Sequence, residues 1–314
     1  MMKPLTLILA ALLTHLVPGL RAGPLQKDHI AADVKWLIHV DLENFLTTEL
    51  GEFVGRELID AKLAKPARDL QKQFGLEFDW RKVRGLTAYG TDYQGRGEAG
   101  GVLLIHSQID LAQALDTAMA KFAALAGGSE PLKKLQTEPY PIYAFKSDAF
   151  ATPLPGNLFL LSRSQKELEN ARQVIKGKAA NLAATKTFSA FPSAAPGFFL
   201  MGVAEGFSKA PLPPQAQVLK RAEGGQLIAG EKAGKLFLDL ALSTQDKEAA
   251  AQIQQVLQGL LALAALSQDK NKDLQQLTQG IKIGGMEKLV TVSLELPVAA
   301  VMSRLTEERQ KRDK

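Results

Sequence analysis

Three histidines follow residue 22 of the chain, and two of them stand at the ends of expected strands. His39 lies near the end of the first expected strand (34–40), just before Asp41. His106 lies near the end of the third expected strand (101–107), shortly before Asp110. Imidazoles and carboxylates that converge on one point can transfer protons or hold a metal ion. In a ferredoxin-like unit the first and third strands are parallel neighbours, so that fold would bring the two histidines together.

The expected side-chain directions argue against such a site. His39 shares the expected open face of its strand with Lys35, whereas His106 corresponds to the core-facing Leu242 in a second copy of the same unit. The two rings are therefore expected to point to opposite sides of the sheet. Asp41 and Asp110 are explained as helix caps, since their carboxylates suit the free N–H groups of a first helical turn. Thus His39, Asp41 and His106 are only weak catalytic candidates, and no metal ligand or cofactor-binding residue is expected.

One literal nucleotide-binding motif occurs, G-x-G-x-x-G at Gly95, Gly97 and Gly100. That motif must open a helix so that a pyrophosphate meets the helix N-terminus, but here the strand 101–107 follows. A hairpin tip explains these glycines better. No nucleophile elbow, zinc-protease motif or calcium loop is present, so the sequence leans away from an enzyme.

The chain contains no cysteine. This excludes disulfides, thiolate zinc sites, thiol catalysis and cysteine-ligated iron–sulfur clusters. It also excludes a lipoprotein anchor, because that lipid is attached to a cysteine.

The first 22 residues have the pattern of a secretory signal peptide. Lys3 precedes an apolar run from Leu5 to Val17, and the small residue Ala22 offers a cleavage site. The run is short for a membrane anchor, although an uncleaved anchor is the alternative. We expect a periplasmic or secreted protein with no transmembrane segment after cleavage.

The charge of the chain is modest. Loss of Lys3 and Arg21 with the leader lowers the formal net charge from +5 to +3, and the remaining basic residues are scattered. Nucleic-acid-binding proteins instead gather basic and aromatic side chains on one surface, so no nucleic-acid partner is expected.

The stretch 236–266 organises the rest of the chain. It predicts a strand, a turn and a long amphipathic helix, whose stripe of Ile253, Val256, Leu257, Leu260, Leu261 and Ala264 is expected to cover a sheet. The stretch 101–126 has the same order, and Asp110 matches Asp246 at a fixed offset. This similarity indicates an internal duplication.

The whole chain then predicts an α+β fold of two tandem ferredoxin-like βαββαβ(βα) repeats, mainly antiparallel, with the helices on one face. A signal peptide (1–22) precedes the first repeat (23–180), a connector (181–196) rich in Ala, Ser, Pro and Gly, and the second repeat (197–314) with its C-terminal helix. The sequence leaves open whether the repeats share one sheet.

Three segments carry a resemblance to known proteins: ADVKWLIHVDLENF, KGKAANLA, and VLQGLLALAAL together with KLVTVSLELPVAAVM. With these segments the chain resembles uncharacterised exported α+β proteins of planctomycete and verrucomicrobial type. The resemblance implies an exported location and an α+β fold, and it implies no site residues.

Together these features favour an exported, soluble, non-enzymatic protein that binds a protein or another component of the cell envelope. Two alternatives stay open. One is a hydrolase with a site near His39 and Asp41, and the other is a carrier that holds an apolar ligand beneath the helix 249–266. The sequence does not indicate the oligomeric state.

Overall fold

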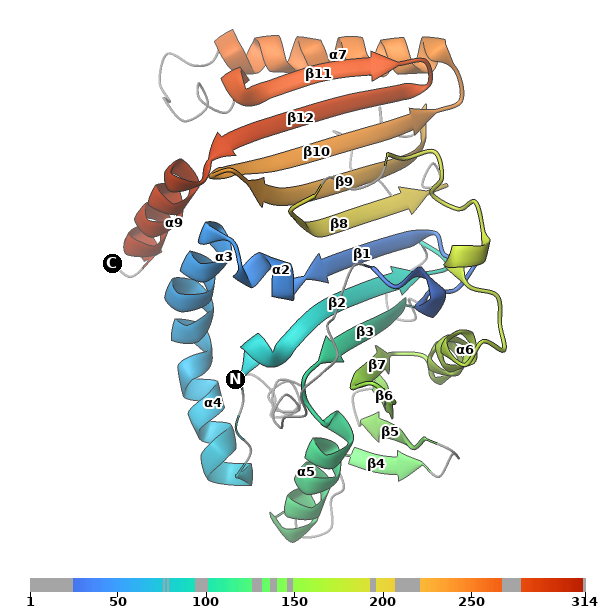
Figure 1. The fold of residues 1–314 in the computed structure, drawn as a ribbon, viewed down its shortest axis with the longest axis vertical. Coiled ribbons are helices and arrows are strands. Elements are labelled where there is room, and N and C mark those ends of the chain that lie inside the picture. The colour runs from blue at the N-terminus through green and yellow to red at the C-terminus, as the bar shows by residue number, and fades with distance from the viewer. Residues whose placement is uncertain are drawn as a thin grey trace. The chain divides into compact units, whose positions relative to one another are not determined.

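The computed structural model describes residues 25–75, 77, 79–93, 101–125, 132–135, 140–145, 149–192, 196–206, 221–266 and 278–312. The predicted signal peptide, residues 1–22, lies outside this described part. The chain divides into two units (Figure 1). The first holds most residues up to Thr185, and the second holds Lys186 onward together with Lys35–Ile38 and Thr48–Leu50.

The first unit contains a sheet in the order β1-β2-β3-β7-β6-β5-β4. From β2 to β4 every neighbouring pair is antiparallel. The strands are β1 (Trp36–Asp41), β2 (Val83–Gly90), β3 (Gly101–Ser107), β4 (Leu132–Leu135), β5 (Ile142–Phe145), β6 (Ala149–Leu154) and β7 (Leu158–Ser162). The helices are α2 (Leu42–Leu46), α3 (Glu49–Val54), the wide-turn segment η2 (Gly55–Asp60), α4 (Ala61–Phe74), α5 (Leu111–Leu125) and α6 (Gln165–Ile175), with short 3₁₀ turns η1 (Lys27–His29), η3 (Trp80–Lys82) and η4 (Leu182–Ala184).

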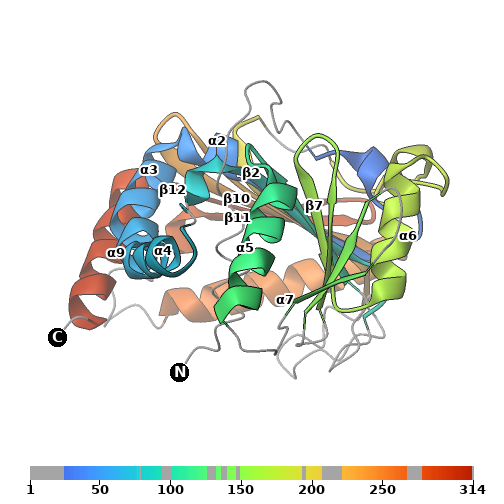
Figure 2. The ribbon, with the colours of Figure 1, turned by 90° about the horizontal axis from the view of Figure 1, so that it is seen from below.

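Helices cover both faces of the first-unit sheet. On one face α5 packs through Leu111, Ala114 and Leu115 against Phe159 and Leu161. On the other, α6 contacts β3, β6 and β7 (Figure 2). The expectation that the helices share one face is therefore wrong for this unit.

The second unit contains a sheet in the order β11-β12-β10-β9-β8 with antiparallel pairing throughout. Its strands are β8 (Phe198–Glu205), β9 (Ala222–Lys232), β10 (Lys235–Thr244), β11 (Ile281–Met286) and β12 (Leu289–Pro297), and its helices are α7 (Lys247–Leu266) and α9 (Val298–Arg312). A small core of Ala222, Leu242, Ala250, Ile253 and Val290 joins α7 to this sheet.

The α+β class and the mainly antiparallel pairing are thus confirmed, but the strand order of the first unit is not that of a ferredoxin-like unit. A ferredoxin-like order would place β1 beside β3, whereas β2 lies between them. Strands that follow one another in the chain usually lie side by side in a sheet. Here β2 lies directly beside β1, and β3 does not insert between them. A further strand, β6, contains Pro153 and pairs with β5 and β7.

The predicted helix caps are confirmed. Asp41 accepts a hydrogen bond from the backbone N–H of Asn44 at 2.9 Å. Asp110 accepts one from the third residue after it at 3.0 Å, and Asp246 accepts one from Ala249 at 2.7 Å. Each carboxylate thereby pairs a donor that has no partner within its helix.

Candidate ligand-binding groove beneath α7

The first half of α7 is packed firmly on the second-unit sheet. Ile253 is fully buried and Ala250 nearly so, both against Leu242 and Val290. Leu257, one turn further on, is only partly buried against the same cluster. Packing against the sheet therefore weakens along the helix.

The second half of α7 presents apolar side chains that the sheet does not cover. Leu260 lies seven residues, or about two turns, after Ile253, so it is on nearly the same side of the helix. It is nevertheless 56% exposed, whereas Ile253 is 0% exposed. Val256 and Leu263 are also exposed. The prediction that the whole stripe covers the sheet is thus correct for Ile253 but wrong for Val256 and Leu260.

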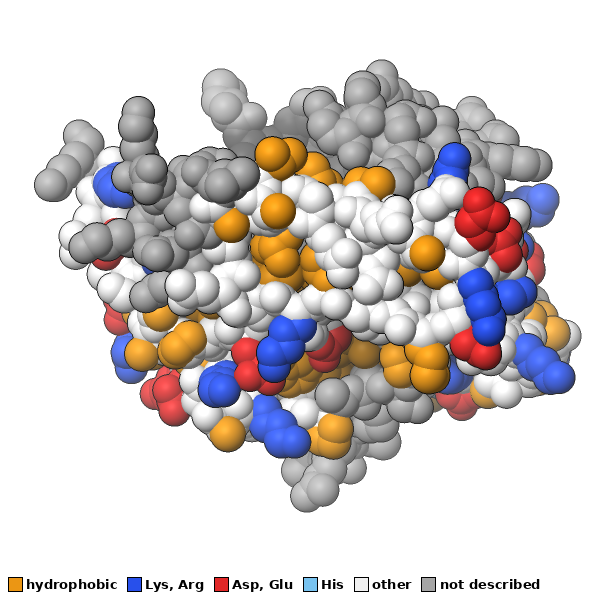
Figure 3. Space-filling model, turned by 90° about the horizontal axis from the view of Figure 1, so that it is seen from above, with side chains coloured by type: hydrophobic (Ala, Val, Ile, Leu, Met, Phe, Trp, Pro, Cys, Tyr) orange, Lys and Arg blue, Asp and Glu red, His pale blue; other side chains and the backbone are white. Residues whose placement is uncertain are grey.

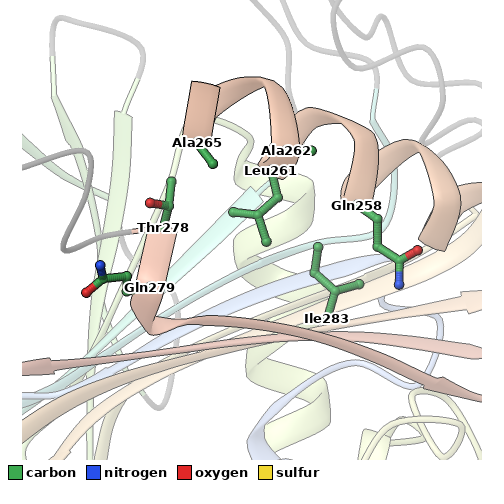
Figure 4. A pocket seen from close by; sticks show the side chains of 7 residues that line it. All are labelled: Gln258, Leu261, Ala262, Ala265, Thr278, Gln279 and Ile283. Atoms are coloured by element: carbon green, nitrogen blue, oxygen red, sulfur yellow. The ribbon is translucent and has the colours of Figure 1, made fainter. Parts of the chain in front are cut away.

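A groove of about 530 Å³ lies between this half of α7 and β11, a volume within the usual range of small-molecule sites. Figure 4 shows Leu261 of α7 and Ile283 of β11 pointing into the hollow from opposite sides. Gln258 stands at one end, and Thr278 and Gln279 stand at the other. The described lining consists of Gln258, Leu261, Ala262, Ala265, Thr278, Gln279 and Ile283.

Beyond Gln258 the space beneath the helix is filled by a polar side chain. The carboxamide oxygen of Gln254 lies 3.1 Å from where a Cβ on Gly285 would be. Since Gly285 has no side chain, the amide of Gln254 lies directly on the backbone of β11. This contact marks where the open part of the groove ends.

Among the described lining residues none is charged. Alternation along β11 turns Lys282 to the face opposite Ile281 and Ile283. On β10 and β12 the same alternation turns Asp239 and Glu295 away from the α7 side. Burial raises the pKa of Asp239, and the nearby Glu295 raises it further. Acidic and basic groups of these strands therefore lie on the other face, and the α7 side is apolar.

Figure 3 views the side of the second unit that carries α7 and β11 in Figure 1. Hydrophobic side chains gather in the middle of this face, and the charged groups lie mainly toward its lower and right-hand margins. The described amides, the one hydroxyl and the aliphatic side chains can orient and enclose an apolar molecule.

His39, a weak catalytic candidate, is buried in the first unit. Its side chain is 3% exposed, and Nδ1 lies 2.9 Å from the hydroxyl of Thr87, which is 2% exposed. Its Nε2 is buried and has no hydrogen-bond partner in the described part of the chain. Burial lowers the pKa of His39 to about 4. A substrate in solution has no access to this contact.

His106 lies on the same face of the sheet as His39, so the prediction that the two rings point apart is wrong. His106 pairs directly with Gly85, and a Cβ on Gly85 would lie 3.8 Å from Cε1 of His39. Burial and, to a smaller extent, the neighbouring His29 and His39 lower the pKa of His106 to about 4. The rings of His29 and His106 are stacked, with centroids 6.0 Å apart and an angle of 8° between their planes.

These three histidines are thus brought together without forming a metal site. Within the described ranges, no group of three or more His, Asp or Glu side chains is arranged to hold a metal ion. Asp41 is engaged as a helix cap, and burial raises its pKa, opposed by hydrogen bonds from the N–H groups of Asn44 and Glu43. The structure therefore offers no exposed acid–base pair at His39 and Asp41.

The sequence indicated the helix above the groove but not the residues that line it. The one signal is that positions 249–266 contain no charged residue, which is unusual for a helix that should have a wet face. The polar residues Gln258, Thr278 and Gln279 carried no recognisable pattern. In the part of the chain that is described, no helix is long and apolar enough to cross a membrane.

Comparison with known proteins gives little beyond this geometry. No protein-family model matches the chain, and no curated protein sequence matches it. Among solved structures the chain is similar to two crystal forms of the protein TP0453. Crystal form IV has a TM-score of 0.46 and 8% sequence identity over 90% of this chain and 97% of that one. Crystal form I has a TM-score of 0.45 and 6% identity over 91% and 98% of the two chains.

Proposed function

We propose that this chain is an exported, non-enzymatic binding protein of the cell envelope, and that it holds an uncharged apolar ligand in the groove between α7 and β11. One observation carries the proposal. Leu261 of α7 and Ile283 of β11 face each other across a groove whose described lining has no charge. An apolar ligand in that space would remove such side chains from water, which stabilises the complex by about 25 cal/mol per Å².

The exported location rests on the pattern of residues 1–22. Export to the periplasm or beyond would place the groove where apolar envelope components occur. A partner protein of the envelope is the other occupant that fits the proposal, since exposed apolar surfaces also mark protein contacts.

We also propose that the two units are tandem copies of one ancestral unit. In each unit a first strand is followed by a hairpin of two strands, a helix capped by Asp110 or Asp246, and a last strand. The last strand lies beside the third strand of the unit and precedes a helix. The shared order β1-β2-β3-β7 and β8-β9-β10-β12 supports this duplication.

The test compares Leu261→Gln with Leu263→Gln in the full chain, expressed with its own leader and recovered from the envelope fraction. Leu261 lines the groove, whereas Leu263 is 62% exposed on the same helix and does not. Native mass spectrometry reports any bound molecule, and Nile red, a neutral apolar dye, reports affinity for the groove. We expect Leu261→Gln to weaken Nile red binding about tenfold, since a buried leucine contributes roughly 1.5 kcal/mol. Leu263→Gln should bind as the wild type does. Absence of both an excess mass and dye binding, or an equal loss in the two variants, would contradict the proposal.

A further inference from the structure

The strap formed by residues 27–34 lies on the α6 side of the first-unit sheet. It begins with η1, which contacts α6 and η4, and the ring of His29 in η1 stacks on that of His106 in β3. We infer that this strap is an acid-operated closure: protonation of His29 and His106 makes the stacked rings repel each other, and the strap leaves the sheet. The device belongs to the first unit and does not depend on the binding function proposed above.

The strap is held to the segment 180–182 by local contacts. The N–H of Leu182 donates to the carbonyl of Ile30 at 2.8 Å, and the N–H of Ala32 donates to the carbonyl of Ala180 at 3.2 Å. The side chains of Ile30 and Leu182 are buried. Contacts confined to a few residues can open while the rest of a domain stays folded. The strap can therefore leave while β2, β3 and β7 stay paired.

The closed strap suits neutral rings. The centroids of the His29 and His106 rings are 6.0 Å apart, and their planes differ by 8°. Nδ1 of His29 and Nε2 of His39 are both buried, and neither has a hydrogen-bond partner among the described residues. His39 lies on the same side of the sheet, across Gly85. A proton on any of these rings places a charge where water is excluded, which disfavours the closed strap.

The charged groups around the pair do not reverse this preference. They are Lys27, Asp28 and Asp33 in the strap, His39 and Asp41 on β1, Tyr89 on β2, and Glu167, Glu169 and Arg172 on α6, whereas η4 has none. Among them Asp28 raises the pKa of His29, but its effect is smaller than that of burial. Arg172 is ion-paired with Glu169 at 2.8 Å. The charges of Glu167 and Asp33 act on Tyr89, whose hydroxyl is hydrogen-bonded to the backbone of the strap.

Acid therefore favours the open strap. Burial lowers the pKa of His29, and burial together with His29 and His39 lowers that of His106 to about 4. In the open strap both rings meet water and regain a pKa of about 6.5. The advantage of the closed strap is complete above pH 6.5 and is lost as the pH falls toward 4. Between pH 7.5 and pH 5.0 the linkage relation for His106 alone raises the ratio of open to closed strap about 25-fold, and His29 adds to the rise.

Hydrogen exchange of the Ala32 and Leu182 amides measures strap opening, because both amides donate across its edge. After correction for intrinsic rates, we expect their protection to fall about 25-fold or more from pH 7.5 to pH 5.0, with little dependence on low concentrations of urea. His106→Phe, which keeps a ring beside His29 but binds no proton, should reduce the fall to a few-fold. His29→Phe, at a half-buried position, should also reduce it. An equal fall in wild type and in either variant that folds, or the same urea dependence at Ala32 as at Ile105 within the sheet, would refute the inference.

A second experiment locks the strap with a disulfide. Ala31 and Asn181 lie opposite each other in an antiparallel bridge, and the chain has no cysteine of its own. The backbone hydrogen bonds flank this pair, so its Cα atoms are about 4.5 Å apart, a spacing that a disulfide spans. The cap that Asn181 provides to Ala184 is lost in the oxidised and reduced forms alike.

We expect the oxidised form of Ala31→Cys/Asn181→Cys to keep the protection of the Ala32 and Leu182 amides at pH 5.0 within about twofold of that at pH 7.5. The reduced form should lose this protection as the wild type does. A similar loss in both forms would show that acid acts on these amides without release of the strap, and it would overturn the inference.

Discussion

Acid should destabilise this protein through His39, and replacement of that residue by leucine should remove the effect. The imidazole is 3% exposed, and its Nε2 is buried without a partner among the described residues. Burial disfavours the charged ring, so the pKa of His39 is lowered from 6.5 to about 4. In the unfolded chain the ring is in water and regains its ordinary pKa of about 6.5.

Whether acid stabilises or destabilises the protein depends on which state, folded or unfolded, binds the proton more readily. Between pH 6.5 and pH 4 the unfolded chain is protonated at His39 and the folded protein is not, so protons favour unfolding. The stability contributed by the neutral, buried ring is complete above pH 6.5 and is lost as the pH falls toward 4. At pH 5 the linkage relation gives a loss of about 2 kcal/mol relative to pH 7.5. That is a large share of the stability of an ordinary domain.

The assay is urea unfolding of the wild type and of His39→Leu at pH 7.5 and pH 5.0, followed by tryptophan fluorescence because Trp80 is buried in the first unit. The wild type should lose about 2 kcal/mol more than the variant between the two pH values. Removal of the hydrogen bond to Thr87 lowers the stability of the variant at both pH values and cancels in this difference. Protonation of Asp41 occurs in both proteins and also cancels. Since His39 lowers the pKa of His106, that pKa is less depressed in the variant, which adds to the expected difference. Equal pH dependence in the two proteins would refute the reasoning.

Two further predictions concern the second unit and its caps. Ile253→Ala should lower the free energy of unfolding by about 2–4 kcal/mol, because Ile253 is fully buried. Leu263→Ala should change it by less than about 0.5 kcal/mol, because that side chain is 62% exposed. Chemical denaturation of both variants measures the difference. Glu231→Ala should lower it by about 1 kcal/mol, because the carboxylate of Glu231 accepts hydrogen bonds from the backbone N–H groups of Glu49 (3.1 Å) and Leu50 (3.0 Å) at the start of α3. Hydrogen exchange of those two amides should quicken in this variant, and unchanged exchange rates would show that the cap is unimportant.

The parts of the fold that the sequence predicted well depend on neighbours in the chain. The alternation of side chains along a strand predicted that Leu238, Leu240 and Leu242 share one face of β10. The carboxylates of Asp41 and Asp110 marked helix starts that the structure confirms. Each of these features involves residues within a few positions of one another. The order of strands in a sheet involves residues far apart in the chain, and the periodicity of a strand does not identify its neighbours. The ferredoxin-like order failed for that reason.

The error in the direction of His106 has a separate cause. Matching Asp110 with Asp246 equates His106 with Leu242, which packs toward α7. In the first unit it is Ile105, one residue earlier, that packs toward α5, so His106 points to the opposite face. A shift of one residue between a strand and the following helix reverses every side chain of the strand.

The groove arises from a mismatch of lengths that only the strand order reveals. α7 has 20 residues and is about 30 Å long, whereas β11, the edge strand beside it, has six residues and is about 20 Å long. The helix therefore extends beyond the strand that lies along its flank, and Leu261 lies where the groove opens between the two. Both lengths can be estimated from the sequence, but nothing in the sequence places β11 at the edge of the sheet beside α7. With a longer strand at that edge, more of the apolar stripe of α7 would be buried in the core, as the sequence alone predicts.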